Sequence, residues 1–262
     1  MGEPLKIASW NVNGLRAVFK KGELSNFLAE HDPDVLLLQE TKAKAAQLPA
    51  ELTDHELYLQ FYHSAVKAGY SGTAIWVKKD RWEKVEFLTG MPGFDDIEGR
   101  VIQVKVPGLR IFGVYFPNGG KSEAAWQGKL AFYEIFLAYI NELRQAGETV
   151  IFAGDVNCCH EEIDIARPKE NDGKIGFHPE ERRRLSEWVA NGWVDVWRQR
   201  YPDTAGVYSW WSFRAGARRR NIGWRIDYFF VDQDFFLKIN RIDYLNEQLG
   251  SDHCPLIMES TF

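Results

Sequence analysis

Short apolar segments recur along all 262 residues, and this repetition constrains the fold more than any other feature of the sequence. Each segment is six to eight residues long and rich in β-branched, aliphatic and aromatic residues, which is the pattern of a buried β-strand. The clearest are LKIASW (5–10), DVLLLQ (34–39), TAIWVK (73–78), VIQVKV (101–106), LRIFGVYF (109–116), TVIFAG (149–154), RIDYFFV (225–231) and PLIMES (255–260).

Helical periodicity is rarer. The clearest helix is predicted over 122–146, where apolar residues recur at steps of three and four until Gly147 ends it. A second begins at Pro179 and ends near Gly192, and a third precedes Pro33. The residues expected to be buried are Trp126, Leu130, Tyr133, Leu137 and Ile140 in the first helix, Leu185, Trp188 and Val189 in the second, and Leu24, Phe27 and Leu28 in the third. Many strands and few helices indicate sheet packed on sheet, with helices outside.

No proline- or glycine-rich linker divides the chain, so we expect one domain spanning residues 1–262. Within it, two segments echo each other. IASWNVNG (7–14) and IFAGDVNCC (151–159) are both apolar strands that run into an N/D-x-N tip. Two related sheets would bring both polar tips to one edge.

Composition sets weaker limits. The net charge of −5 does not favour a nucleic-acid partner, but phosphate contacts need only a locally positive face, and 214–225 holds five arginines and no acid. The three cysteines fit neither a disulfide framework nor a zinc site, which indicates a reduced, cytoplasmic compartment, nucleoid-associated in a prokaryote. No apolar run is long enough to predict a membrane partner.

Polar side chains follow the predicted strands, in loops of the kind that usually carry catalytic groups. A single Asn or Asp there is normally a turn former. The presence of acids and amides at so many strand ends favours an oxygen-rich site of the kind that suits Mg²⁺. The residues concerned are Asn11, Asn13, Glu40, Asn118, Asp155, Asn157, Asp227, Asp252 and His253.

A histidine oriented by a carboxylate is a common catalytic arrangement, although a lone histidine is more often structural. His253 and Asp227 are candidates for such a pair. The sequence contains no Gly-x-Ser-x-Gly elbow, Walker P-loop, GxGxxG or HExxH motif. Acyl-transfer hydrolases, nucleotide kinases, Rossmann dehydrogenases and zinc proteases are therefore disfavoured.

The segment YSWWSFRAGARRRNIGWRIDY (208–228) mixes aromatic residues with arginines. Arginine grips phosphates bidentately, and aromatic walls can hold an extrahelical base or sugar. A surface loop folded over its own hydrophobic cluster would explain some of the tryptophans, but we favour a nucleic-acid interface.

Together these motifs resemble the exonuclease III type of apurinic/apyrimidinic (AP) endonuclease. GSDHCP alone indicates only the wider superfamily of metal-dependent phosphodiesterases and phosphatases, whereas NVNGLRA, HEEIDIARPK and WRIDY are specific to the DNA repair branch. The matching segments run in order along almost the whole chain: SWNVNGLRA (9–17), LLLQETK (36–42), GYSG (69–72), VYFPNGG (114–120), GDVNCCHEEIDIARPKEN (154–171), YSWW (208–211), RNIGWRIDYF (220–229) and GSDHCP (250–255).

The resemblance implies a four-layer α/β sandwich, that is, two packed mixed β-sheets flanked by helices, of the endonuclease/exonuclease/phosphatase type. It implies a monomer that acts in base excision repair on double-stranded DNA containing abasic sites. The implied reaction is hydrolysis of the phosphodiester 5′ to the abasic site with Mg²⁺, for which Mn²⁺ substitutes, leaving a 3′-hydroxyl. Exonuclease, 3′-phosphodiesterase and damaged-base nicking activities stay open.

The resemblance also implies residue roles. Glu40 is the principal magnesium carboxylate, accompanied by Asn11, Asp252, Asp155 and Asn157. Asp155, helped by Asn157, orients or deprotonates the attacking water, and His253, held by Asp227, stabilises charge on the phosphate. Further contacts to the reacting group are Tyr115, Asn118 and Asn171. The DNA-binding residues are Trp210, Trp224 and Ile226 around the flipped-out sugar, and Arg16, Lys42, Tyr70, Lys121, Arg214 and Arg218 along the strands.

Two rival functions remain. One is a phosphodiesterase or phosphatase of the same superfamily that acts on lipids or inositol phosphates, against which the arginine-rich aromatic segment speaks. The other is a catalytically dead DNA-binding module, against which speaks the presence of all of Glu40, Asp155, Asp227, Asp252 and His253.

Overall fold

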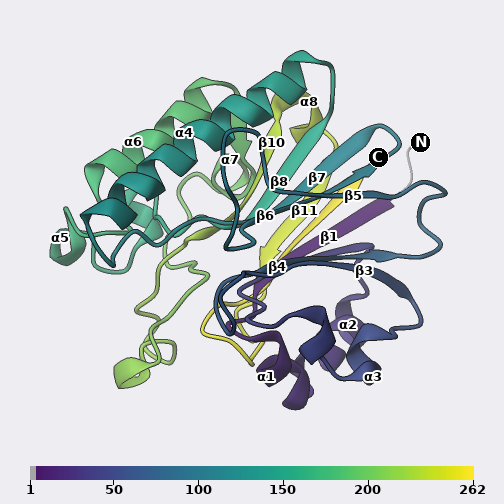
Figure 1. Cartoon of the computed structure of the whole chain (residues 1–262). Coiled ribbons are helices and arrows are strands. Elements are labelled where there is room, and N and C mark those ends of the chain that lie inside the picture. Colours follow the sequence, from purple (N-terminus) through teal and green to yellow (C-terminus); the bar gives the residue numbers. More distant parts are fainter. Residues whose placement is uncertain (1–3) are drawn as a thin grey trace.

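The computed structural model describes residues 4–262 and contains two six-stranded sheets (Figure 1). In spatial order, the first sheet consists of β11 (Ile239–Tyr244), β12 (Leu256–Thr261), β1 (Pro4–Asn11), β2 (Val35–Gln39), β4 (Thr73–Lys78) and β3 (Tyr58–His63). The second consists of β5 (Glu86–Thr89), β6 (Val101–Val106), β7 (Leu109–Tyr115), β8 (Val150–Asp155), β10 (Asp227–Asp232) and β9 (Trp193–Asp195). All eight predicted strands are confirmed, and β3, β5, β9 and β11 were not predicted.

The two sheets share one pattern of strand directions. β1 runs parallel to β2 and antiparallel to β12, while β8 runs parallel to β7 and antiparallel to β10. The echo between residues 7–14 and 151–159 therefore marks equivalent strands. Register aligns Asp155 with both Tyr115 and Asp227, so the polar ends of β7, β8 and β10 coincide.

The sheets pack face to face through a shared hydrophobic core. Successive side chains of a strand point to opposite faces. One face of each sheet therefore fills this core, and the other face packs on helices. The core residues contributed by the central strands include Leu5, Ile7, Val35 and Leu37 of the first sheet and Ile102, Val104, Ile111 and Ile151 of the second.

Helices cover both outer faces (Figure 1). α1 (Leu15–Lys20), α2 (Glu23–His31) and α3 (Ala50–Thr53) lie on the first sheet, where Phe27 packs with Trp10. α4 (Glu123–Gln145) and α6 (Pro179–Ala190) lie on the second, where Phe136 and Trp188 contact Phe152. The order helices, sheet, sheet, helices confirms the predicted four-layer α/β sandwich. The remaining short helices are α5 (Pro168–Asn171), α7 (Val196–Arg200), α8 (Gln233–Phe236), η1 (Ala45–Gln47), η2 (Glu162–Asp164) and η3 (Arg214–Gly216).

The long helix forms where it was predicted, but the buried face differs. The Ser122 hydroxyl accepts from the backbone N–H of Ala125 at 3.2 Å and so caps α4. Tyr133 and Ile140 are buried as expected, whereas Trp126, Leu130 and Leu137 are only half-buried, so that part of the prediction was wrong. The core-facing residues are Lys129, Phe132, Tyr133, Phe136 and Ile140. α4 carries two adjacent apolar stripes, and periodicity alone does not say which one meets the sheet.

The other two predicted helices correspond to α6 and α2. In α6, Leu185 and Trp188 are fully buried, but the predicted burial of Val189 was wrong, because this side chain is 46% exposed. Val189 lies about 100° further round the helix than Trp188, which turns it away from the sheet. In α2, Leu24 and Phe27 are buried and Leu28 is half-buried. Within residues 4–262, none of the helices combines the length and apolarity needed to cross a membrane.

Candidate active site

A cavity of about 350 Å³ lies where β7 and β8 end and β10 begins, beside the loop that follows β2. One side of its wall carries acids, amides and a histidine, and the other side is largely apolar. The lining residues are Glu40, Tyr115, Asn118, Asp155, Asn157, Ile175, Gly176, Trp210, Trp224, Ile226, Asp252 and His253.

Asn11, at the end of β1, holds two carboxylates together. Its buried side-chain NH₂ donates to Asp155 Oδ2 at 2.8 Å and to Glu40 Oε1 at 3.0 Å. Its Oδ1 accepts from the backbone N–H of Asn13 at 3.0 Å, which fixes the orientation of the amide. Asn11 therefore acts as a donor between the two sheets, and in this arrangement its oxygen is turned away from the carboxylates.

Glu40 follows β2 directly and has a backbone φ of +51°. This left-handed conformation is unfavourable for a residue with a Cβ and costs of order 1 kcal/mol. It is fixed by the loop, because the carbonyl of Glu40 accepts from the N–H of Gly14 at 2.8 Å. The carboxylate also forms an ion pair with Lys42, whose Nζ lies 2.7 Å from Oε2.

His253 and Asp227 form the predicted pair. His253 Nδ1 lies 2.8 Å from Asp227 Oδ2, and both side chains are buried. Burial opposes protonation of the imidazole, but the charge of Asp227 and its hydrogen bond outweigh burial and raise the pKa of His253 to about 10. The second ring nitrogen, Nε2, lies 3.8 Å from Asp155 Oδ2. The site thus presents an imidazolium to the cavity at neutral pH.

Asp155 ends β8 and is almost fully buried. Burial is the largest cause of its raised pKa, followed by repulsion from Asp227, while His253 opposes the shift; the result is a pKa of about 7. Its Oδ1 accepts from the backbone N–H of Asn157 at 2.8 Å. A carboxylate with these surroundings suits proton transfer near neutral pH.

The acidic part of the cavity can hold a divalent cation. Glu40 and Asp155 each offer a carboxylate oxygen, and these oxygens lie within 4.8 Å of each other and of a ring nitrogen of His253, which can act as a ligand only when the imidazole is neutral. The two carboxylates supply hard oxygen donors, which fit an ion such as Mg²⁺ better than a soft metal. The Asn157 amide lines the same cavity. The donor set therefore fits the kind of ion that the sequence predicts.

Two amides and a tyrosine complete the polar wall. Asn118 Nδ2 donates to Asn157 Oδ1 at 3.2 Å, and Asn157 Nδ2 donates to the carbonyl of Phe116 at 2.9 Å. Tyr115 lies beneath Arg100, whose guanidinium is 4.7 Å from the ring centroid. Burial, and then the charges of Glu40 and Asp155, raise the pKa of Tyr115 well above its usual range, so its hydroxyl is a proton donor.

Trp210, Trp224 and Ile226, which the sequence predicts around the flipped-out sugar, lie together in the apolar wall. The two indole rings lie edge to face with centroids 5.8 Å apart, and short backbone bridges join Trp210 to Trp224 and to His253. Gly176 packs so closely that a Cβ there would lie 2.6 Å from the Trp224 ring. The apolar wall is thus tied to the histidine and closed by a glycine that the sequence analysis did not identify.

Asp252 occupies the rim between the polar and apolar walls. Its Oδ2 accepts from Trp210 Nε1 at 3.1 Å, and its Oδ1 accepts from Asn13 Nδ2 at 2.8 Å. Asn13 was noted as a strand-end residue without a role, and its side chain also contacts Lys42. The Ser251 hydroxyl also donates to Oδ1 at 3.3 Å, so Asp252 is engaged by three donors; it lies outside the Glu40, Asp155 and His253 cluster.

Some of the residues predicted to bind DNA lie near the cavity, and others are exposed elsewhere on the described surface. Tyr70 and Lys121 line a neighbouring cavity of about 510 Å³, which shares Asn118 with the first. Arg16, on α1, and Arg214, on η3, are exposed. Lys42 contacts both Glu40 and Asn13. Arg100 also lines the second cavity, and no sequence signal distinguished it.

Two predicted residues make mainly internal contacts. Arg218 donates to the backbone carbonyls of Asn246, Gln248 and Ser251 at 2.7–3.0 Å, so it holds the loop before His253. Asn171, at the end of α5, donates to the carbonyl of Arg167 at 2.9 Å and is not among the residues that line the cavity.

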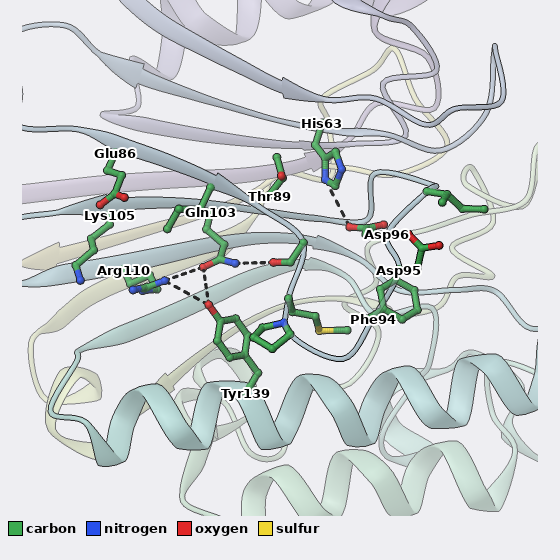
Figure 2. A pocket seen from close by; sticks show the side chains of 15 residues that line it. His63, Glu86, Thr89, Phe94, Asp95, Asp96, Gln103, Lys105, Arg110 and Tyr139 are labelled. Atoms are coloured by element: carbon green, nitrogen blue, oxygen red, sulfur yellow. Dashed lines mark hydrogen bonds and ion pairs between the residues drawn. The ribbon is translucent and has the colours of Figure 1, made fainter.

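A larger cavity, of about 730 Å³, shares no lining residue with the candidate site (Figure 2). It lies beside the edge strand β5 and the middle of α4. Its polar groups pair with one another: Arg110 donates to Gln103 Oε1 at 3.0 Å, and Gln103 Nε2 donates to the carbonyl of Gly90. We therefore place the chemistry in the smaller cavity, which is lined by carboxylates, a histidine, amides and aromatic rings.

Comparisons with known proteins agree with this geometry. Residues 8–253 match the profile of the Endonuclease/Exonuclease/phosphatase family. An exodeoxyribonuclease of Bacillus subtilis is 41% identical over 252 residues, which cover 96% of this chain and 98% of the relative. The DNA repair nuclease APEX1 of Danio rerio is 37% identical over 256 residues, covering 97% and 81%. The crystal structure of the AP endonuclease LMAP from Leishmania major superposes with a TM-score of 0.88 at 31% identity, covering 99% of this chain and 88% of that one. The chain belongs to the Endonuclease/Exonuclease/phosphatase family, in the branch of exodeoxyribonucleases and AP endonucleases that its motifs resemble.

Proposed function

We propose that this protein is a DNA repair nuclease that hydrolyses the phosphodiester 5′ to an abasic site in duplex DNA and leaves a 3′-hydroxyl. The observation that carries the proposal is one cavity in which Glu40, Asp155 and the Asp227–His253 pair face an apolar wall of tryptophans. The names of the relatives, an exodeoxyribonuclease, a DNA repair nuclease and an AP endonuclease, support it. Exonuclease activity at 3′ ends is a related activity of the same site.

The proposed cofactor is Mg²⁺, with Mn²⁺ as a substitute. Glu40 would hold it as the main carboxylate, with Asp155 and Asn157 beside it and Asn11 fixing both carboxylates. When bound, such an ion neutralises charge on the phosphate and acidifies water. Asp252 would support the metal site indirectly, because it accepts hydrogen bonds from the side chains of Asn13 and Trp210.

The reacting phosphate would lie between the imidazolium and the amides. His253, charged because of Asp227, donates to a phosphate oxygen and stabilises the negative charge that develops there. Asp155, held by Asn157, orients and deprotonates the attacking water. Tyr115 and Asn118 donate to phosphate or leaving-group oxygens from the same wall, and Asn171 would reach this region only after moving away from Arg167.

The apolar wall supplies selectivity. An abasic sugar has no base to unpair, so flipping it outward costs less than the few kcal/mol needed for an intact nucleotide. Trp210, Trp224 and Ile226 would receive that sugar, and Gly176 packs against Trp224 and so fixes the position of its ring in the wall. The tetrahydrofuran analogue of an abasic site is accordingly the expected substrate.

Duplex DNA would be held mainly through its backbone. The predicted backbone contacts are half-buried or exposed side chains from five different segments: Arg16, Lys42, Tyr70, Lys121 and Arg214. Arg218 would contribute by fixing the loop before His253. Contacts of this kind make binding weaken as salt rises, by about 0.9 of a log unit per log unit of salt for each phosphate neutralised. We propose that the protein acts as a monomer in the cytoplasm or nucleoid.

One assay tests the proposal. A labelled duplex with a single tetrahydrofuran site is incubated with the protein, with and without Mg²⁺, and the products are sized. We expect one cut 5′ to the site that requires the metal and leaves a 3′-hydroxyl. Faster cleavage of a phosphoinositide would favour the lipid phosphatase alternative, and DNA binding without cleavage would favour a dead binding module.

A further inference from the structure

Lys129 is a buried lysine that contacts both amide-bearing loops of the candidate site from behind. It lies on the core-facing side of α4 and is completely buried. Its ammonium donates to the carbonyl of Asn157 at 2.8 Å and to the carbonyl of Asn118 at 3.2 Å. These two residues carry the side-chain amides of the polar wall. One α4 side chain thus sets the relative position of two loops that precede and follow that helix.

Glu181 completes this arrangement from α6. It is also completely buried and forms an ion pair with Lys129. Its Oε2 accepts from the backbone N–H of Gly176 at 2.7 Å and from that of His178 at 3.1 Å. Gly176 is the residue packed against Trp224 in the apolar wall. The pair therefore joins the polar wall, through Asn118 and Asn157, to the apolar wall.

Burying two opposite charges stabilises a fold only weakly, because the cost of removing them from water offsets most of their attraction. An apolar pair of similar volume would fit between α4 and α6 at least as well. What such a pair could not do is donate to two carbonyls and accept from two N–H groups at once. The ion pair thus provides directional contacts to the cavity wall, which is the function that distinguishes it from ordinary packing.

We infer that Lys129 and Glu181 are positioning residues that hold Asn118, Asn157 and Gly176 in fixed relative positions around the reacting phosphate. This inference rests on the proposed cleavage at abasic sites. Lys129 does not line the cavity, so its effect is transmitted through the loops it holds. A displacement of about 1 Å at reacting groups can cost roughly 100-fold in rate. Groups that bind the rest of the DNA duplex are not touched by the pair.

The test compares Lys129→Met with wild type on the tetrahydrofuran duplex. We expect kcat to fall by about 100-fold while KM changes by less than about threefold, because positioning is lost and backbone binding is kept. The double variant Lys129→Met/Glu181→Met removes both charges and should regain part of the thermal stability lost in Lys129→Met, because no unpaired buried charge remains, without regaining kcat. Recovery of kcat together with Tm in the double variant would show that the pair is merely structural, and would overturn the inference.

A matched control lies on the second sheet, the one that α4 covers. Arg110 is also buried, and it pairs with Glu148 through Nε at 2.6 Å and Nη2 at 2.9 Å. It lies on β7, five residues before Tyr115, which at 3.3 Å per residue is about 16 Å from that site residue. Arg110 lines the larger cavity (Figure 2), so Arg110→Met should lower Tm like Lys129→Met but leave kcat unchanged. An equal loss of kcat in both variants would refute a specific positioning role.

Two further outcomes keep this inference distinct from the proposed function. If wild type fails to cut the duplex, the proposed function fails; if wild type cuts and Lys129→Met retains its kcat, only the positioning role fails. Should Lys129→Met not fold, the double variant Lys129→Met/Glu181→Gln replaces it, since the glutamine keeps an oxygen acceptor for Gly176 and His178 and leaves no unpaired buried charge, while the contacts to the carbonyls of Asn118 and Asn157 are lost. Its kcat should fall with little change in KM, and an unchanged kcat would contradict the inference.

Discussion

At the scale of single residues, the candidate site depends on groups held in unusual states. Glu40 and Asn157 both have backbone φ values in the left-handed region, +51° and +57°. Asp155 has a raised pKa because it is buried beside Asp227. Strained backbone conformations and shifted pKa values are common at functional sites. They cost free energy, so they persist only where many surrounding contacts hold the residue in place.

Asp155→Asn tests the proposed base. The amide keeps the shape of the side chain but cannot accept a proton, so we expect kcat to drop by about 10²- to 10⁴-fold with KM nearly unchanged. Steady-state kinetics on the tetrahydrofuran duplex measures both constants. A rise in KM with an unaltered kcat would remove Asp155 from the role of base.

Gly176→Ala tests the tightness of the apolar wall. A Cβ at this position would lie 2.6 Å from the Trp224 ring, so overpacking of about 1–3 kcal/mol should displace that ring and lower kcat/KM roughly tenfold or more. Gly173→Ala is the matched control, since Gly173 also has positive φ, +71°, but has no atom within 4 Å of the added Cβ. Equal losses in the two variants would assign the effect to backbone strain instead.

At the scale of elements, the four unpredicted strands are the four edge strands. β11 and β3 end the first sheet, and β5 and β9 end the second. Most edge strands have more contact with solvent, so their sequences need fewer apolar residues. The burial of β5 illustrates this, since Phe87 and Leu88 are half-buried and both ends are exposed. β9 is instead fully buried but only three residues long, too short for a recognisable apolar run. The central strands, buried on both faces, are the ones whose apolar runs are visible in the sequence.

α4 is the element that links the fold to the site, and its N-terminus begins next to Lys121. Ser122→Ala removes the cap and should reduce the free energy of unfolding by about 1 kcal/mol, a Tm decrease of about 2–4 °C for a chain of this size. Ser122→Asp keeps an acceptor at the cap and should retain the wild-type Tm. Calorimetry on the three proteins checks this, and an identical Tm for Ser122→Ala would argue against the cap.

At the scale of the whole molecule, a buried charge cluster joins segments from both sheets. The Arg225 guanidinium donates to Asp164 at 2.8 and 3.0 Å and to Asp195 at 2.6 and 3.1 Å. Tyr244, on β11 of the first sheet, contacts the same guanidinium at 3.4 Å and donates to the carbonyl of Asp227 at 2.7 Å. The cluster thereby connects β11 of the first sheet to the backbone of Asp227, the residue whose carboxylate orients His253.

This cluster predicts a specific acid dependence of stability. Burial disfavours the Asp164 carboxylate, but the charge and hydrogen bonds of Arg225 outweigh burial and lower its pKa to about 2. Because the folded pKa is below the unfolded value of about 3.9, the stabilisation is present above pH 4 and is lost as the pH falls towards 2. Between pH 5 and 3, wild type should lose about 1 kcal/mol more than Asp164→Asn in urea unfolding. Parallel curves would mean that Asp164 titrates normally.

How far sequence alone reaches can be judged from particular residues. The motifs placed Asp227 beside His253, and the structure puts them 2.8 Å apart. They also suggested Asn11 as a metal ligand, whereas its amide donates to Glu40 and Asp155. The difference arises because a motif records residue type, while the orientation of an amide depends on every donor and acceptor around it. Lys129 carried no motif, since a lysine in an amphipathic helix normally indicates a solvated face.

The sequence by itself determined the layered α/β architecture, because strand and helix periodicities are local and record which side chains must avoid water. It also determined the inventory of acids, amides and imidazole at the strand ends. Only the tertiary structure decided how these groups meet: Asn11 bridges partners 29 and 144 positions away, and such distances follow from sheet packing. It likewise decided which stripe of α4 is buried, because two apolar stripes satisfy the same periodicity and only the opposing sheet selects one.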